Sequence, residues 1–398
     1  MQLRYNFRLY PRPGQRQALA RAFGCARVVF NDGLRVRTDA HAAGLPYISD
    51  GDLSKRVITE AKKIPERSWL GEVSAVVLQQ ALADLNKAYR NFFDSVTGKR
   101  KGPKVATPRF RSKRDNRQAI RFTKNARFSI TPGGKLRLPK IGDVTVRWSR
   151  ALPAEPSCVT VAKDAAGRYF ASFVVEVAEQ PLPMAEPEAG IDLGLSAFAV
   201  LSNGRKIDSP RFLRRADKKL KRLQRALSRK AKGSNNRAKA RLAVARQHAK
   251  IADTRREFHH QLSTKLIREN QAIYVEDLAV AGLARTRLAK SVHDAGWSAF
   301  VGMLEYKARL YGRVFHRIDR WFPSSKLCSA CGALAASMPL NVRQWECPCG
   351  AVHDRDVNAA INILAAGRAD RLNACGAQVR PGPAPAQREE AGSLRGAA

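Results

Sequence analysis

Two close pairs of cysteines near the C-terminal end constrain the folding of this chain more than any other feature. Two residues separate Cys328 from Cys331, one residue separates Cys347 from Cys349, and 15 residues lie between the pairs. Four thiolates at this spacing are typical of a tetrahedral Zn²⁺ site in which each pair forms a knuckle. Four cysteine ligands leave no open coordination position, so the pattern predicts one structural Zn²⁺. The alternative is four unliganded thiols.

The other three cysteines, Cys25, Cys158 and Cys375, are isolated. An odd number of cysteines favours a reducing compartment over a disulfide framework. The first residues also lack the apolar stretch of a secretory signal. The sequence therefore predicts a cytoplasmic protein.

The charge of the chain indicates its partners. It contains 72 Lys+Arg and 34 Asp+Glu in 398 residues, which gives a net charge of +38. Such an excess favours binding to polyanions, of which nucleic acid is the first choice and an anionic membrane the second. No run of about 18 apolar residues is present, so we expect no transmembrane helix and no membrane partner.

The first half of the chain changes its pattern twice. Leu3, Tyr5, Phe7 and Leu9 alternate with polar residues, as in a half-buried strand, and apolar residues then recur at helical spacing. Residues 99–150 hold 17 Lys/Arg and two Asp in a strand-like pattern. We therefore expect a strand at 1–10, a helical module at 11–98, a basic β-barrel at 99–180 that the first strand joins, and a proline-rich linker at 181–188.

The second half alternates strands and helices. Asn203-Gly204 between apolar runs predicts a hairpin. Residues 214–250 hold 15 Lys/Arg and one acid, broken by a turn at 233–236, which predicts a basic αα-hairpin that binds a polyanion or, alternatively, a solvated helix face. Further along, we expect strands at 272–278 and 314–321, helices at 297–312 and 356–367, and a disordered tail at 368–398.

Three acidic residues stand in unusual contexts. Asp192 lies between two glycines in an apolar strand, Glu276 ends another apolar strand, and Asp356 begins the last helix. Carboxylates that converge from separate elements can hold two Mg²⁺ ions for phosphodiester cleavage. Each acid also has a simpler interpretation: Asp192 could cap a turn, Asp277 competes with Glu276, and Asp356 could be an N-cap, with Asp354 as its rival.

Four motifs in this order resemble the TnpB proteins of insertion sequences, which are also regarded as ancestors of compact type V CRISPR effectors. They are GIDLG at residues 190–194, VEDL at 275–278, WFPSSKLCSACG at 321–332 and CGAVHDRDVNAA at 349–360. The resemblance covers nearly the whole chain. One departure is the second cysteine pair, which has one intervening residue where many family members have two.

The resemblance implies a multidomain α+β and α/β fold with a RuvC-like, RNase H-type nuclease core. Asp192, Glu276 and Asp356 would be its three carboxylates and would hold two catalytic Mg²⁺. The core would span 189–320 with the helical hairpin inserted at 212–270, followed by a Zn ribbon at 321–352 and a last RuvC-like segment at 353–367. The helical module and the β-barrel would be the recognition and wedge domains.

The resemblance also implies partners and an activity. A guide RNA from the end of the element would pair with double-stranded target DNA next to a short motif that the protein reads, and the protein would associate with the nucleoid. The main hypothesis is thus an RNA-guided DNA endonuclease.

Two alternatives remain open. The first is a guided repressor without cleavage, which is disfavoured because all three acids are present. The second is a strand-transferring transposase, which usually has its third acid soon after the second, whereas Asp356 lies 80 positions after Glu276 here. The sequence leaves four properties open: the oligomeric state, the guide sequence, the adjacent motif and the cut pattern.

Overall fold

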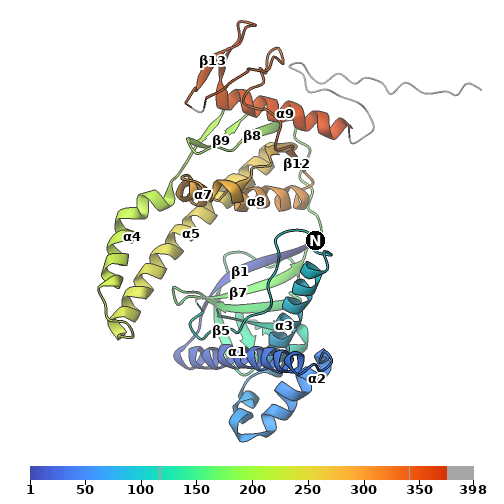
Figure 1. Ribbon diagram of the computed structural model, residues 1–398, viewed down its shortest axis with the longest axis vertical. Coiled ribbons are helices and arrows are strands. Elements are labelled where there is room, and N and C mark those ends of the chain that lie inside the picture. Colours follow the sequence, from blue (N-terminus) through green and yellow to red (C-terminus); the bar gives the residue numbers. More distant parts are fainter. Residues whose placement is uncertain (116–117, 340, 374–398) are drawn as a thin grey trace, which may run out of the picture. The chain divides into compact units, whose positions relative to one another are not determined.

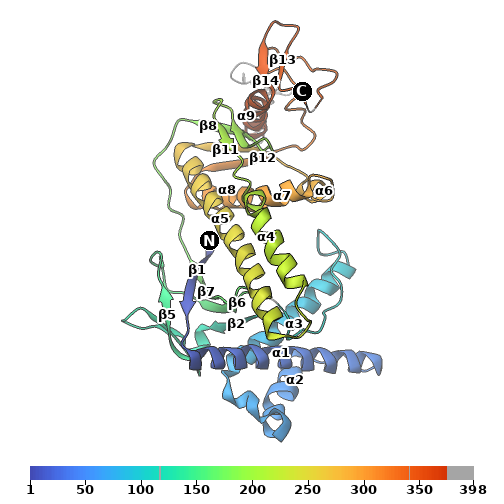
Figure 2. The same ribbon diagram turned by 90° about the vertical axis from the view of Figure 1, so that its left-hand side faces the viewer.

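The computed structural model describes residues 1–115, 118–339 and 341–373. The chain forms two compact units, Met1–Val177 and Ala178–Ala398. Both combine helices and sheets (Figures 1 and 2), which confirms the expected multidomain mixed fold. Within the described ranges, no helix has the length and apolar composition needed to cross a membrane.

The first unit is built on a seven-stranded antiparallel sheet curled into a half barrel. The strand at the start of the chain, β1, joins this sheet as expected, and it lies in the middle, between β7 and β5. Phe7 and Leu9 of β1 are buried on one face. The strands, in spatial order, are β2 (Gln118–Thr123), β6 (Cys158–Lys163), β7 (Tyr169–Glu176), β1 (Gln2–Tyr10), β5 (Gly142–Arg147), β4 (Lys135–Leu138) and β3 (Ser129–Ile130).

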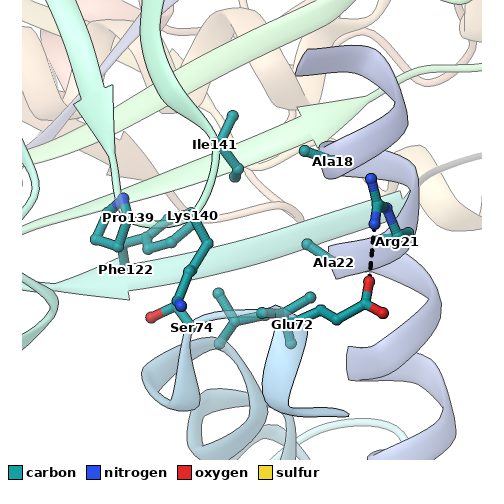
Figure 3. A pocket seen from close by; sticks show the side chains of 11 residues that line it. Ala18, Arg21, Ala22, Glu72, Ser74, Phe122, Pro139, Lys140 and Ile141 are labelled. Carbon is teal, nitrogen blue, oxygen red and sulfur yellow. Dashed lines mark hydrogen bonds and ion pairs between the residues drawn. The ribbon is translucent and has the colours of Figure 1, made fainter. Parts of the chain in front are cut away.

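Helices of the first unit pack on one another and on this sheet. A small cavity of about 80 Å³ lies where α1, the end of η3, the start of α3, β2 and the β4–β5 turn meet. Figure 3 shows the side chains that line it. An ion pair of 2.8 Å between Arg21 and Glu72 lies at its edge. The helices are α1 (Pro13–Ala42), α2 (Asp50–Ser54), η1 (Lys55–Glu60), η2 (Ala61–Lys63), η3 (Pro65–Glu72), α3 (Ala75–Val96) and η4 (Lys124–Ala126).

The second unit contains a five-stranded sheet and a separate two-stranded hairpin. In the larger sheet β8, β11 and β12 are parallel, and β9 and β10 are antiparallel additions joined by the predicted Asn203-Gly204 turn. The strands of this sheet, in spatial order, are β10 (Lys206–Asp208), β9 (Ala197–Leu201), β8 (Glu188–Asp192), β11 (Ala272–Glu276) and β12 (Val314–Ile318). The hairpin consists of β13 (Gln344–Glu346) and β14 (Val352–Asp354).

Helices cover both faces of the five-stranded sheet. On one face Ile273 and Val275 pack with residues of α5 and α8. On the other face Ala272 and Tyr274 pack against α9 (Figure 1). Since successive strand residues point to opposite faces, this burial assigns every side chain of β11 to a face. The helices are α4 (Phe212–Ser228), α5 (Asn235–Glu269), α6 (Val280–Leu283), α7 (Ala289–Ala295), α8 (Trp297–Leu310) and α9 (Arg355–Asn373).

The basic αα-hairpin is confirmed. Helices α4 and α5 lie side by side in both views and are joined by a short turn (Figures 1 and 2). The apolar residue Leu220 of α4 is buried. The neighbouring basic residues Lys218, Lys219 and Arg222 are exposed. The hairpin therefore presents a largely cationic surface.

Two glycines allow α9 to lie directly on the sheet. A Cβ on Gly190 of β8 would stand 2.1 Å from the carbonyl oxygen of Ala360, and a Cβ on Gly367 would stand 2.1 Å from Cδ1 of Tyr274. Any larger side chain at either position would push the helix away from the sheet. The first glycine of the GIDLG motif is thus required for close packing.

The predicted end of the last helix at Gly367 is wrong. Helix α9 continues to Asn373, because Gly367 serves close packing rather than helix termination. Arg368 and Arg371 in the added turn both pair with Glu188. The remainder of the predicted disordered tail, residues 374–398, lies outside the described residues. The strand predicted to reach Trp321 ends at Ile318, and Trp321 is 84% exposed.

A buried histidine predicts how stability depends on pH. His259 of α5 is 2% exposed and lies among Phe198, Phe258 and Phe300. Burial lowers its pKa from 6.5 to about 4. The unfolded chain therefore takes up a proton near pH 6.5 that the folded chain refuses until about pH 4, so stability is lost as the pH falls through this window.

We expect the free energy of unfolding to lose about 2 kcal/mol from this residue between pH 8 and pH 5. Denaturant unfolding at pH 8 and pH 5 measures the free energy of unfolding at each pH. The decrease between the two pH values should be smaller in His259→Leu than in the wild type by this amount. His248→Leu, an exposed histidine on the same helix, should behave as the wild type. Equal pH dependence in His259→Leu and the wild type would contradict this assignment.

Candidate active site and cysteine cluster

Asp192 and Glu276 end two neighbouring parallel strands. Strands β8 and β11 pair with Ile191 opposite Val275, so the next residues in each strand are neighbours as well. Ile191 and Val275 face α5 and α8. Alternation therefore turns Asp192 and Glu276 toward the other face, where α9 lies.

Asp356 lies in the first turn of α9, the helix that covers the face to which Asp192 and Glu276 turn. The helix begins at Arg355, and its N-cap is Asp354, whose Oδ1 accepts a hydrogen bond of 3.0 Å from the backbone N–H of Val357. Lys206 also pairs with Asp354 at 2.6 Å. Burial favours a higher pKa for Asp354, but these contacts outweigh it and lower the pKa. Because Asp354 performs the capping, Asp356 is not needed for it.

The charges of Asp356 and Glu276 affect the ionisation of Asp192. The pKa of Asp192 is raised to about 7 by burial first and then by the negative charges of Asp356 and Glu276, while Arg355 and Arg343 oppose the shift. Like charges held together in a desolvated place disfavour ionisation. A divalent cation would relieve this repulsion, so the site suits a cation of high charge.

The ambiguity between Glu276 and Asp277 is resolved by their contacts. Burial and the charge of Asp277 raise the pKa of Glu276. Asp277 points elsewhere and is ion-paired with Arg320, whose Nε also donates to the Asp277 carbonyl. Glu276 is thus the acid that faces Asp192, and Asp277 has its own cationic partner.

Arg343 is a site residue that the sequence analysis missed. Its Nη1 lies 3.3 Å from Oδ2 of Asp356, and its Nη2 donates a hydrogen bond of 2.8 Å to Oγ of Ser196. Its carbonyl accepts from the backbone N–H of Arg355 at 2.8 Å. In a chain with 72 Lys+Arg, no sequence signal distinguishes this arginine.

The four cysteines come together as the spacing predicts. Their sulfur atoms all lie within 4.8 Å of one another. Sγ of Cys328 is 3.8 Å from Sγ of Cys349, and Sγ of Cys331 is 3.6 Å from Sγ of Cys347. Zn–S bonds of about 2.3 Å in a tetrahedron place sulfurs about 3.8 Å apart. The geometry therefore fits Zn²⁺, and the tighter second pair does not prevent it.

The surroundings of the cluster favour thiolate at one position. Burial alone would raise the pKa of Cys328, but backbone N–H groups of Cys331 and Ala330 and the ring of His353 outweigh it and lower the pKa to about 6. Nε2 of His353 is 3.0 Å from this sulfur. Among the described residues the cysteines form the tight group of potential metal ligands, and the three carboxylates do not form a comparably tight one.

Three family models match separate parts of the chain. The model described as "Probable transposase" (OrfB_IS605) matches residues 172–287, "Cas12f1-like, TNB domain" matches 297–363, and "Helix-turn-helix domain" (HTH_OrfB_IS605) matches 1–45. Over residues 1–45, the described structure consists of β1 and the single long helix α1.

Relatives match over almost the full length. A protein of Streptomyces pristinaespiralis named "Putative RNA-guided DNA endonuclease" is 46% identical, covering 95% of this chain and 92% of that protein. "Putative RNA-guided DNA endonuclease InsQ" of Escherichia coli (strain K12) is 32% identical, with 95% of each chain covered.

Among solved structures, that of Cas12f1 with single guide RNA and target DNA has a TM-score of 0.54 and 14% identity, covering 87% of this chain and 81% of that one. The RNA-guided endonuclease Cas_phi3 has a TM-score of 0.50 and 10% identity, covering 91% and 92%. At these identities the likeness concerns the fold.

The matched domains and the full-length relatives thus place the chain among the OrfB_IS605-type proteins. Within that class, the chain belongs to the TnpB family that includes InsQ, as the sequence motifs predict.

Proposed function

We propose that this protein is an RNA-guided DNA endonuclease and that Asp192, Glu276 and Asp356 form its active site. One observation supports the proposal: strand alternation turns Asp192 and Glu276 to the face that α9 covers, and burial, followed by the charges of Asp356 and Glu276, raises the pKa of Asp192. The names of the full-length relatives support the activity.

The three carboxylates would hold two Mg²⁺ ions, which prefer oxygen ligands. Bound there, the ions would activate a water and stabilise the leaving oxygen of a phosphodiester. The chain supplies the rest: β8 and β11 fix Asp192 and Glu276, and α9 fixes Asp356 against the sheet through its close approach at Gly190. Arg343, beside Asp356, would balance the charge of the site or of a nearby phosphate.

Guide RNA and target DNA would bind the basic surfaces through their phosphates, while base pairing supplies the sequence specificity. The net charge of +38 and the exposed lysines of the α4–α5 hairpin support this role. Since each neutralised phosphate releases counterions, guided binding should weaken steeply as salt rises.

The test uses protein purified together with its cellular RNA. The RNA is sequenced, and a plasmid library is built with the matching target next to randomised flanking bases. We expect Mg²⁺-dependent cleavage of plasmids with one flanking motif. Guided binding without cleavage at any Mg²⁺ concentration would favour a repressor, and joined DNA products formed without RNA would favour a transposase. Either result would overturn the proposal.

Substitutions of Asp354 and Asp356 should have different effects, because we assign helix capping to the first residue and metal binding to the second. In Asp356→Asn we expect cleavage to fall by about 10³-fold with little change in stability, because several kcal/mol of transition-state stabilisation depend on the metal ligands. In Asp354→Ala we expect a loss of about 1 kcal/mol in stability with cleavage retained, because the cap and the ion pair with Lys206 are removed while the three proposed metal ligands stay. Cleavage rates and thermal unfolding of both variants check this; the reverse pattern would show that the roles are exchanged.

We further propose that the cysteine cluster holds one structural Zn²⁺. Purified protein should contain zinc at one equivalent per chain by elemental analysis, and Cys331→Ser should contain much less. Cys158→Ser, which changes an isolated cysteine, is the matched control and should retain its zinc. Zinc-free wild type with full cleavage activity would contradict this role.

A further inference from the structure

Two asparagines on α9 are buried against the first cysteine knuckle. Asn358 is 1% exposed and Asn362 is 3% exposed. They are four residues apart and so lie on the same side of the helix, one turn from each other. Burial of two amide side chains is costly unless they are hydrogen-bonded. Their partners therefore indicate what they do.

Each amide binds backbone next to Cys328. Nδ2 of Asn358 donates to the carbonyl of Leu327 at 2.7 Å, and its Oδ1 accepts from the N–H of Ser329 at 2.9 Å. Asn358 thus holds both residues that flank the cysteine. It fixes the peptide segment that carries the Cys328 sulfur.

The second asparagine extends the same contact. Nδ2 of Asn362 donates to the carbonyl of Leu327 at 2.7 Å and to that of Ser324 at 2.8 Å. The Leu327 carbonyl is therefore shared by the two amides. These four hydrogen bonds join the knuckle to α9 without any contribution from a metal.

The same helix carries Asp356, two residues before Asn358. The second part of the ribbon contacts this end of the helix too, because Arg343 binds the Asp356 carboxylate and its carbonyl accepts from the N–H of Arg355. The cysteine ribbon is therefore hydrogen-bonded to α9 on both sides of Asp356, at Arg355 and at Asn358. A movement of the knuckle must move the helix or break these bonds.

We infer that Asn358 and Asn362 are positioning residues that couple zinc retention in the cysteine cluster to the placement of Asp356. This inference rests on the proposed nuclease function. Loss of zinc would loosen the knuckle and let Asp356 leave its place beside Asp192 and Glu276. Conversely, loss of the amides would leave buried carbonyls unsatisfied and weaken the hold on zinc.

The first experiment measures zinc release to the chelator pyridylazoresorcinol from Asn358→Ala and Asn362→Ala, each purified with its RNA. We expect release about 10-fold faster than in wild type, as is typical for partners that orient metal ligands. Ile361→Ala, an exposed neighbour on the same helix, should release zinc at the wild-type rate. Wild-type release from both asparagine variants would overturn the inference.

The second experiment compares cleavage with guided DNA binding in the same proteins. We expect cleavage to fall about 10-fold in both asparagine variants, and to fall in wild type stripped of zinc, with DNA binding unchanged in each case. If an alanine variant loses DNA binding through misfolding, Asn358→Asp keeps the side-chain size and the acceptor for Ser329, and it replaces the donor to Leu327 with a carboxylate oxygen that also adds a charge. Faster zinc release with full cleavage would overturn the coupling.

These outcomes are distinguishable from failure of the proposed function. If wild type with zinc, RNA and Mg²⁺ never cuts DNA, the nuclease proposal fails whatever the zinc measurements give. If wild type cuts and the asparagine variants match it in cleavage and zinc release, only the positioning role fails.

Discussion

Asp192→Asn is expected to abolish DNA cleavage, with a rate at least about 10³-fold below wild type, while guided DNA binding stays intact. Asparagine has the shape of aspartate but lacks its charge, and it is a poor replacement for a carboxylate ligand of Mg²⁺. Burial, and then the charges of Asp356 and Glu276, raise the pKa of Asp192. The substitution therefore removes the carboxylate on which both other acids act.

The same substitution should leave a second signature that does not depend on activity. Without Mg²⁺ the neutral side chain relieves the repulsion among the acids, so the variant should melt at or above the wild-type temperature. Added Mg²⁺ should raise the melting temperature of wild type by binding the folded state, but not that of the variant. Asp208→Asn, an exposed aspartate in the same sheet, should respond like wild type. Full cleavage by Asp192→Asn would refute its role.

Glu276→Gln should lose cleavage to a similar extent, about 10³-fold, whereas Asp277→Asn should remain within about twofold of wild type. The reason is the direction of the side chains. Glu276 faces the α9 side of the sheet, and Asp277 is occupied by Arg320. An exposed ion pair contributes little to stability, so Asp277→Asn should also fold normally.

This pair of neighbours provides a stringent control, because both variants remove one negative charge at almost the same point of the chain. Cleavage rates measured with the same RNA and plasmid decide between them. If Asp277→Asn is inactive and Glu276→Gln is active, then the assignment of the strand faces is wrong.

Part of the site could be predicted because the short apolar runs of two buried strands are visible in the sequence. β8 and β11 are buried on both faces, so these runs locate the strands, and the family motifs single out Asp192 and Glu276 at their ends. The cysteine spacing likewise predicts the cluster. In both cases the signal lies within short stretches of sequence, so the feature can be predicted without knowledge of contacts between distant segments.

Other features depend on contacts between distant segments and left no local signal. The sequence offered both Asp354 and Asp356 at the start of the last helix, and the hydrogen bond to Val357 assigns the cap to Asp354. Gly367 looked like a helix end, but it is a packing position against Tyr274. Arg343 and Asn358 are ordinary residue types for a basic chain and a polar helix, and their partners lie 13 and 31 residues away.

Anomalous X-ray scattering from Mn²⁺ in crystals of the protein with its guide RNA and target DNA would test the central claim most directly. The account predicts two peaks about 3.5–4 Å apart, in contact with carboxylate oxygens of Asp192, Glu276 and Asp356. Mn²⁺ peaks bound by other residues, with these three carboxylates apart and metal-free, would contradict it.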